Sequence, residues 1–242
     1  MFSKITQSPT LVRVLPFAVF LALTFFQDRC GDAARYWIYL GKTIAGGAML
    51  VAVYRHIPEL EWRFTWEALA IGVGVFAFWV GLDGHYPSVD AINSQYICPF
   101  LQKLGLAQSC AASEQRAPWN PNLTFGGESP LTLFFIVARI VGSTLVVPAL
   151  EETFYRSFVY RFLASKDFLA LPLGKFLAVP FFVTSILFGL GHREWLAGIL
   201  CGFAYQGLVI WKNRLGDAVT AHAITNFLLG LWIVWKGAWH FW

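Results

Sequence analysis

The chain has 242 residues, of which 57% are hydrophobic and only 13% are charged, and its formal net charge is +4. Soluble domains rarely combine so many apolar residues with so few charges, so the composition indicates an integral membrane protein. The basic residues are dispersed at the ends of apolar runs and form no patch, so we expect no nucleic-acid partner.

Apolar runs, taken in chain order, predict seven membrane helices. Each run approaches the roughly 20 residues that cross a hydrocarbon core of about 30 Å as a helix, and none alternates as the strands of a membrane barrel do. The predicted fold class is therefore all-α, a polytopic membrane helix bundle that forms a single domain over residues 1–242. The runs lie at about 11–27, 36–54, 66–82, 131–150, 175–191, 195–211 and 217–236.

The segment at about 83–130 differs from the rest because it contains five prolines together with Asn, Ser and Gly. It predicts a long extramembrane loop. The part beginning at Val89 is apolar enough for a short helix that lies on the membrane or enters it as a shallow re-entrant helix, and the whole segment could supply an eighth membrane helix. Lys and Arg in the short loops favour an N-terminus inside, which places this loop outside. Cys98 and Cys110 share the loop, so a disulfide can form between them if that side is oxidising.

Two adjacent acids follow one of the most apolar runs, in the stretch LVVPALEETFYRSF. An ionisable group within the membrane is costly and is a candidate for function. Helical periodicity continues beyond Glu151 and Glu152, which predicts one long helix bent at Pro148. Arg156 lies four residues after Glu152 on the same face, where the two can pair. The alternative is that the acids simply begin an inner loop.

Two later helices carry functional candidates four residues apart, the same spacing as Glu152 and Arg156. FGLGH places Phe188 and His192 four residues apart, and HAITN places His222 and Asn226 one turn apart. Together with the two glutamates, these residues could line a polar intramembrane cavity. A Glu and a His can deprotonate water, and a His and an Asn can donate hydrogen bonds to the oxyanion that forms during peptide hydrolysis. Each histidine could instead be a satisfied structural residue.

Arg139, near the middle of the fourth run, should face the protein interior, because a guanidinium in contact with lipid is costly.

The three motifs, EETFYR, FGLGH and HAITN, in this order on successive apolar helices, resemble the CAAX-protease and bacteriocin-processing (CPBP or Abi) family of intramembrane proteases, which includes the Rce1-type prenyl-protein endopeptidases. The resemblance covers about 131–230, the expected catalytic core. It implies that Glu151 and His192 activate the water and that His222 and Asn226 form the oxyanion hole. Glu152, Arg156 and Phe188 would support the site.

The stretch that starts at Arg139 and runs through the motif EETFYR is also similar to a bacterial subgroup found alongside exosortase protein-sorting systems. That similarity implies a bacterial inner (cytoplasmic) membrane. The substrate would then be a membrane-associated or lipid-anchored peptide or protein. Rce1-type enzymes have eight membrane helices, one more than the seven clear runs.

The metal requirement is open at this point. Glu151, His192 and His222 could form a His₂Glu zinc set with one position left for water. No H-E-x-x-H motif is present, so each ligand would come from a different helix. We favour a glutamate mechanism that requires no cofactor, with a divalent metal such as zinc as the alternative.

The residues also leave two other functions open. A proton-coupled transporter would tolerate buried Glu and His, although no inverted repeat is visible in the sequence. A non-catalytic membrane scaffold could retain the same fold without activity.

Overall fold

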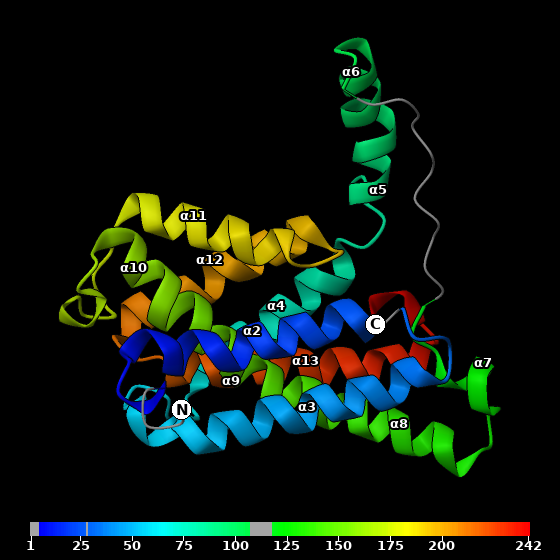
Figure 1. Ribbon diagram of the computed structural model, residues 1–242, viewed down its shortest axis with the longest axis horizontal. Helices are drawn as coiled ribbons and strands as arrows, with labels where there is room; N and C mark the ends of the chain where they lie inside the picture. Colours follow the sequence, from blue (N-terminus) through cyan, green and yellow to red (C-terminus); the bar gives the residue numbers. More distant parts are fainter. Residues whose placement is uncertain (1–4, 28, 107–117) are drawn as a thin grey trace.

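In the computed structural model, residues 5–27, 29–106 and 118–242 are described, and their regular secondary structure is entirely helical. The membrane helices lie roughly side by side along the long axis of the molecule (Figure 1). The helices have these bounds: α2 Pro9–Gln27, α3 Ala34–Val53 continued by η1 Tyr54–His56, α4 Trp66–Gly81, α5 Val89–Ile92, η2 Asn93–Ile97, α6 Cys98–Lys103, α7 Pro121–Phe125, α8 Pro130–Val141, η3 Gly142–Val146, α9 Val147–Glu152, η4 Thr153–Val159, α10 Tyr160–Ala164, η5 Phe168–Ala170, α11 Ala178–Leu190, α12 Trp195–Lys212, α13 Gly216–Lys236 and η6 Trp239–Phe241.

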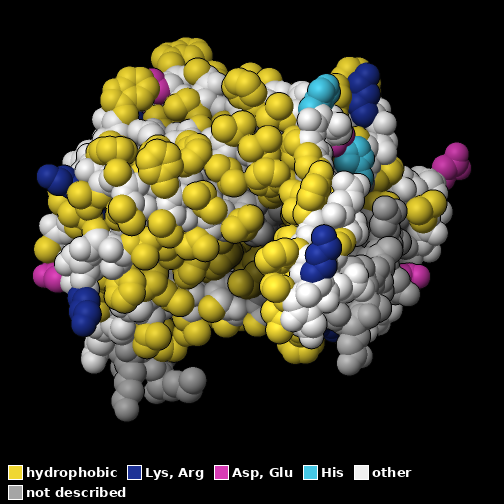
Figure 2. All heavy atoms as spheres, turned by 90° about the horizontal axis from the view of Figure 1, so that it is seen from above, with side chains coloured by type: hydrophobic (Ala, Val, Ile, Leu, Met, Phe, Trp, Pro, Cys, Tyr) yellow, Lys and Arg dark blue, Asp and Glu magenta, His cyan; other side chains and the backbone are white. Residues whose placement is uncertain are grey.

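Among the described residues, five helices are long and apolar enough to cross a membrane: Pro9–Gln27, Ala34–His56, Pro130–Ala164, Trp195–Lys212 and Gly216–Lys236. Two shorter apolar helices, Trp66–Gly81 and Ala178–Leu190, match the third and fifth predicted runs. Apolar side chains cover the middle of the face seen in Figure 2, and most charged side chains lie toward the two ends of the long axis. This distribution fits a protein embedded in a bilayer.

The fourth run, expected at 131–150, is longer in the structure. One helix of 35 residues continues through the two glutamates to Ala164. It contains two π-helical segments, η3 just before Pro148 and η4 just after Glu152. Proline cannot donate a backbone hydrogen bond, and a π-helical turn is one way in which a helix accommodates this loss. The helix therefore extends past Glu152 and Arg156, whose side chains are buried inside the bundle.

α13 occupies the centre of the bundle and packs against α4, α12 and the α8–α9 helix. Its contact with α4 is close, because a Cβ on Gly72 would lie 2.6 Å from the carbonyl oxygen of Ala221. The hydroxyl of Thr65, at the start of α4, donates to Asp217 at 2.8 Å in the first turn of α13. These contacts fix the helix that carries His222.

α11 and α12 form a tightly packed pair. A Cβ on Gly198 would lie 2.9 Å from the Cα of Gly189, so the two backbones approach closely at this crossing. The turn between the helices contains His192. The small residues at this crossing therefore position this histidine.

The segment from 83 to 130 contains the predicted helix. α5, η2 and α6 follow one another over residues 89–103 and project roughly at right angles to the bundle axis (Figure 1). Phe100 in α6 is 60% exposed. The pairing of Cys98 with Cys110 stays a prediction, because Cys110 lies outside the described residues.

Candidate functional site

The structure brings Glu151, His192 and His222 together from three different helical segments. One carboxylate oxygen of Glu151, Oε2, lies 4.0 Å from Nε2 of His192 and 4.0 Å from Nε2 of His222. Glu151 sits at the end of α9, His192 in the turn after α11 and His222 in α13. The first of the two glutamates is therefore placed between the two histidines.

The orientation of His192 is set by its own helix. Nδ1 of His192 lies 2.7 Å from the carbonyl oxygen of Phe188, one turn earlier. A carbonyl oxygen only accepts hydrogen bonds, so Nδ1 carries a proton and Nε2 is turned toward Glu151. The ring of Phe188 packs beside the imidazole at 4.7 Å between centroids, and Trp79 of α4 packs on it edge-on at 5.5 Å.

His222 is held by Glu152 and Tyr205. Nδ1 of His222 lies 2.9 Å from Oε1 of Glu152, and the ring of Tyr205 stacks on the imidazole with an interplanar angle of 24°. The hydroxyl of Tyr205 donates to Thr225 at 2.7 Å, which fixes the stacked ring. His222 therefore also turns Nε2 toward Glu151.

Glu152 and Arg156 form the ion pair that their spacing predicts. Nε of Arg156 lies 3.1 Å from Oε2 of Glu152, and both side chains are fully buried. The guanidinium also lies over the ring of Phe188, 4.2 Å from its centroid. Phe188 thus contacts His192 and Arg156 at once and joins the two parts of the site.

Asn226 has a partner that its sequence motif does not reveal. Its Nδ2 donates to the carbonyl oxygen of Ser143 at 2.8 Å. In the π-helical register of η3, Val147 donates to Gly142, so Ser143 would pair next with Pro148, which has no N–H. The proline therefore leaves a carbonyl group free, and Asn226 binds it.

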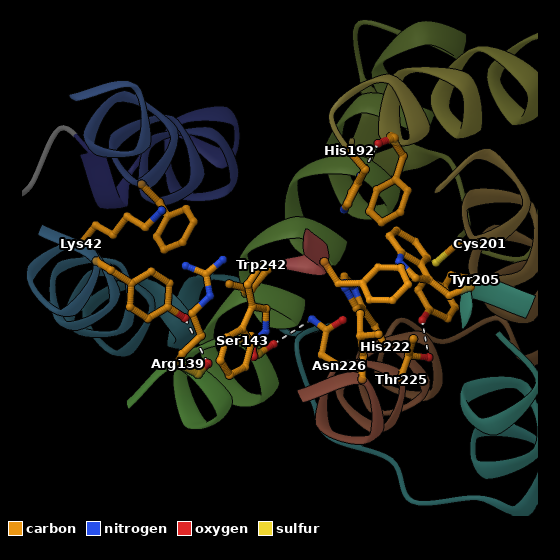
Figure 3. A pocket seen from close by; sticks show the side chains of 17 residues that line it. Lys42, Arg139, Ser143, His192, Cys201, Tyr205, His222, Thr225, Asn226 and Trp242 are labelled. Carbon is orange, nitrogen blue, oxygen red and sulfur yellow. Dashed lines mark hydrogen bonds between the residues drawn. The ribbon is translucent and has the colours of Figure 1, made fainter. Parts of the chain in front are cut away.

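A cavity of about 220 Å³ lies beside these residues. Its wall includes His192, His222, Asn226 and Phe188 but not Glu151. In Figure 3, Lys42 and Arg139 lie on one side of the cavity, and His192, Tyr205 and Cys201 lie on the other. The other lining residues are Phe20, Tyr39, Trp79, Ser143, Val147, Thr225, Leu229, Phe241 and Trp242.

Arg139 faces this cavity and not the outer surface of the bundle. Its guanidinium lies over the rings of Tyr39 at 4.6 Å and Trp119 at 4.7 Å. Lys42, from α3, donates to Thr24 at 2.8 Å and lies over the ring of Phe20. Aromatic faces thus shield both cations from lipid.

Within the described part of the chain, no group of three or more His, Cys, Asp and Glu side chains is arranged closely enough to hold a metal ion. The 4.0 Å separations in the set of Glu151, His192 and His222 agree with this finding. The same three residues nevertheless have the donor types of a His₂Glu zinc site.

The residues that sequence reasoning missed are Trp79, Ser143 and Tyr205. Tyr205 and Trp79 belong to no motif and contact the histidines only after the helices pack. The backbone carbonyl of Ser143 could have been suspected, because a proline five residues later leaves a carbonyl unpaired in a π-helical turn.

These features define a polytopic helical membrane protein with a buried glutamate–histidine site. Residues 132–228 of the chain match the model of the family described as type II CAAX prenyl endopeptidase Rce1-like. The match covers all three motifs and agrees with the resemblance drawn from them. Comparisons with curated proteins and with solved structures give no match.

Proposed function

We propose that this protein is an intramembrane endopeptidase that hydrolyses a peptide bond within or near the membrane. The observation that carries the proposal is the position of Glu151, 4.0 Å from Nε2 of both His192 and His222, in a segment that matches a family of endopeptidases. Two carboxylates, two imidazoles and a carboxamide on three packed helices supply the groups that such a hydrolysis requires.

Glu151 and His192 would activate the water. Atoms 4.0 Å apart do not form a direct hydrogen bond, but one water can lie within hydrogen-bond distance of both. Glu151 takes a proton from this water as the oxygen attacks the carbonyl carbon of the peptide bond. The proton then passes to the leaving amine as the carbon–nitrogen bond breaks.

His222 and Asn226 would stabilise the oxyanion. Nδ1 of His222 lies 2.9 Å from Oε1 of Glu152, so Nε2 would donate a hydrogen bond only when both ring nitrogens carry a proton. The amide nitrogen of Asn226 has two N–H groups. One binds Ser143, and the second is left for the oxyanion.

The proposal extends to the membrane topology, the cellular location and the class of substrate. The two shorter apolar helices would cross the membrane with the five long ones, giving seven membrane helices in one domain over 1–242 and a catalytic core at about 131–230. The cavity lined by His192, His222 and Asn226 would be the polar intramembrane chamber. We place the protein in a bacterial inner membrane, in the exosortase-associated subgroup, acting on a membrane-associated or lipid-anchored peptide or protein.

We further propose that the reaction needs no metal. Zinc bound by Glu151, His192 and His222 would instead lower the pKa of a bound water and supply the hydroxide directly. Activity that survives a chelator, in protein without bound metal by elemental analysis, supports the glutamate mechanism. Activity lost to the chelator and restored by zinc would establish the metal mechanism instead.

A cleavage assay with the purified protein tests the proposed function. The protein is reconstituted in vesicles with labelled membrane-spanning and lipid-anchored peptides, and the products are identified by mass spectrometry. Cleavage at a defined bond supports the endopeptidase. Proton flux across the vesicle membrane without cleavage would indicate a transporter, and the absence of both would indicate a non-catalytic scaffold.

A further inference from the structure

A second pocket is lined by residues at the start of α2, in the loop before α4 and near the end of α10. The start of α2 and the end of α10 lie at the left end of the bundle in Figure 1. It has a volume of about 370 Å³ and shares no lining residue with the cavity at the glutamate–histidine site. Its charged wall consists of Arg13, Glu59 and Arg161. The catalytic proposal makes no use of these residues.

The three charged side chains form a compact buried network. Oε1 of Glu59 lies 2.8 Å from Nη2 of Arg13 and 2.6 Å from Nη2 of Arg161. The hydroxyl of Ser157 donates to the same oxygen at 2.5 Å. The side chains of Arg13, Arg161 and Glu59 are only 1%, 6% and 11% exposed.

The charges in this network do not balance. Two guanidinium groups face one carboxylate, so the described residues of the network carry one surplus positive charge. A buried charge is costly unless it is compensated. His56 also lines the pocket.

Arg161 has hydrogen-bonding capacity left over. Its Nε donates to the carbonyl oxygen of Ser157, and its Nη2 donates to Glu59 and Ser157. Its Nη1 makes no hydrogen bond to any described residue and is not enclosed, so its two N–H groups remain for a ligand. A guanidinium edge of this kind suits a phosphate oxygen.

The wall also has an apolar part, formed by Pro9, Val12, Pro58 and Leu169, and its other lining residues are the polar Thr6, Gln7 and His56. Leu169 is 45% exposed. The pocket lies at the ends of membrane-spanning helices, where lipid headgroups are found, and basic pockets between such helices bind anionic headgroups. A phosphate at Arg161 with glycerol and acyl carbons on the apolar wall would match both parts of the pocket.

We propose that this pocket binds the phosphate group of an anionic phospholipid. The binding test uses the full-length protein in a non-ionic detergent, titrated with phosphatidylglycerol, phosphatidylcholine or inorganic phosphate and followed by native mass spectrometry. Phosphatidylglycerol should bind at least about fivefold more tightly than phosphatidylcholine, as expected for one basic group near an anionic lipid.

One variant removes a positive charge from the network and another removes the negative charge. Their opposite expected effects distinguish lipid binding from structural damage. Arg161→Gln should weaken phosphatidylglycerol binding about fivefold, whereas Glu59→Gln should strengthen it by a similar factor, although both disturb the same network. Arg161→Lys keeps the charge and should retain the preference for phosphatidylglycerol. Arg63→Gln, in an exposed ion pair with Glu61 and outside the pocket, should leave binding unchanged.

Three results would overturn the proposal. Equal binding of phosphatidylglycerol and phosphatidylcholine would exclude an anionic-lipid site. Saturation by inorganic phosphate, with no further effect of lipid, would assign the pocket to a free anion. Weaker binding in Glu59→Gln as well as in Arg161→Gln would show that the network has only a structural role.

Discussion

Glu152 connects His222 to Arg156, because its Oε1 lies 2.9 Å from Nδ1 of His222 while its Oε2 pairs with Arg156 at 3.1 Å. The two glutamates are neighbours in sequence, but successive helical residues point about 100° apart. Glu152 is directed into the buried pair, and Glu151 is directed between the histidines. This geometry favours the proposed assignment of a bracing role to Glu152 and a reacting role to Glu151.

The Glu152→Gln substitution should mainly destabilise the protein. It leaves the buried Arg156 without its charge partner, and the loss of one member of a buried ion pair costs about 3 kcal/mol or more. Glutamine keeps an oxygen that can accept from His222, so part of the activity should remain. Thermal unfolding in detergent, measured together with turnover, checks both expectations. Normal stability with complete loss of turnover would assign the reacting role to Glu152.

His192→Ala should abolish cleavage as completely as Glu151→Gln does. Both residues would act on one water, so the double variant should lose little more than either single variant. Peptide-cleavage rates of the three variants check this. His85→Ala is the matched control, because His85 is exposed, its ring contacts the backbone carbonyl oxygen of Asp83, and it does not line the cavity. Substantial turnover in His192→Ala would remove this residue from the proposed mechanism.

Asn226→Ala should lower kcat by about a hundredfold, as expected for the loss of one oxyanion donor, while His222 maintains some activity. The carbonyl oxygen of Ser143 also loses its partner. The loss of one hydrogen bond costs about 1 kcal/mol, so the variant should unfold at a slightly lower temperature. Single-turnover rates and a thermal scan measure the two effects separately. An unchanged kcat would show that Asn226 serves only to bind the helix containing Ser143.

Glu59 should make the stability depend on pH. Burial raises the pKa of Glu59, but the hydrogen bond from Ser157 and the positive charge of Arg13 outweigh burial and hold the pKa below 4.5. A carboxylate whose pKa is depressed in the folded state stabilises the protein above its unfolded pKa, and this stabilisation is lost as the pH falls through the folded pKa.

The difference in melting temperature between the wild type and Glu59→Gln should therefore shrink as the pH is lowered from about 6 to about 3. The comparison is made in a non-ionic detergent without anionic lipid, so that lipid binding does not contribute. Glu61→Gln, an exposed carboxylate nearby, should show a smaller difference at every pH. A Glu59→Gln difference that stays constant over this range would contradict the assigned pKa shift.

Local spacing predicted those parts of the site that lie on one helix. Glu152 and Arg156 are four residues apart, so their pairing follows from helical geometry alone. The contact between Glu152 and His222 joins residues 70 positions apart. It depends on how α13 packs against the long helix, and no single helix pattern contains that information.

Hydropathy alone ended the fourth run too early, whereas the helical periodicity beyond the two glutamates correctly predicted one long helix. Glu151, Glu152 and Arg156 interrupt the apolar pattern, yet the helix continues to Ala164 because the charges are paired or buried inside the bundle. The sequence did not predict the two π-helical turns either, although Pro148 indicated a local break in the hydrogen-bond ladder.

The most direct test of the central claim, that Glu151 is the base of an intramembrane endopeptidase, is the cleavage rate of purified Glu151→Gln beside the wild type on the same membrane peptide. We expect the wild type to cleave at one defined bond and Glu151→Gln to show no cleavage above background, with an unchanged melting temperature in detergent, because Glu151 makes no close ion pair that stabilises the fold. Normal turnover in a correctly folded Glu151→Gln protein would contradict the account.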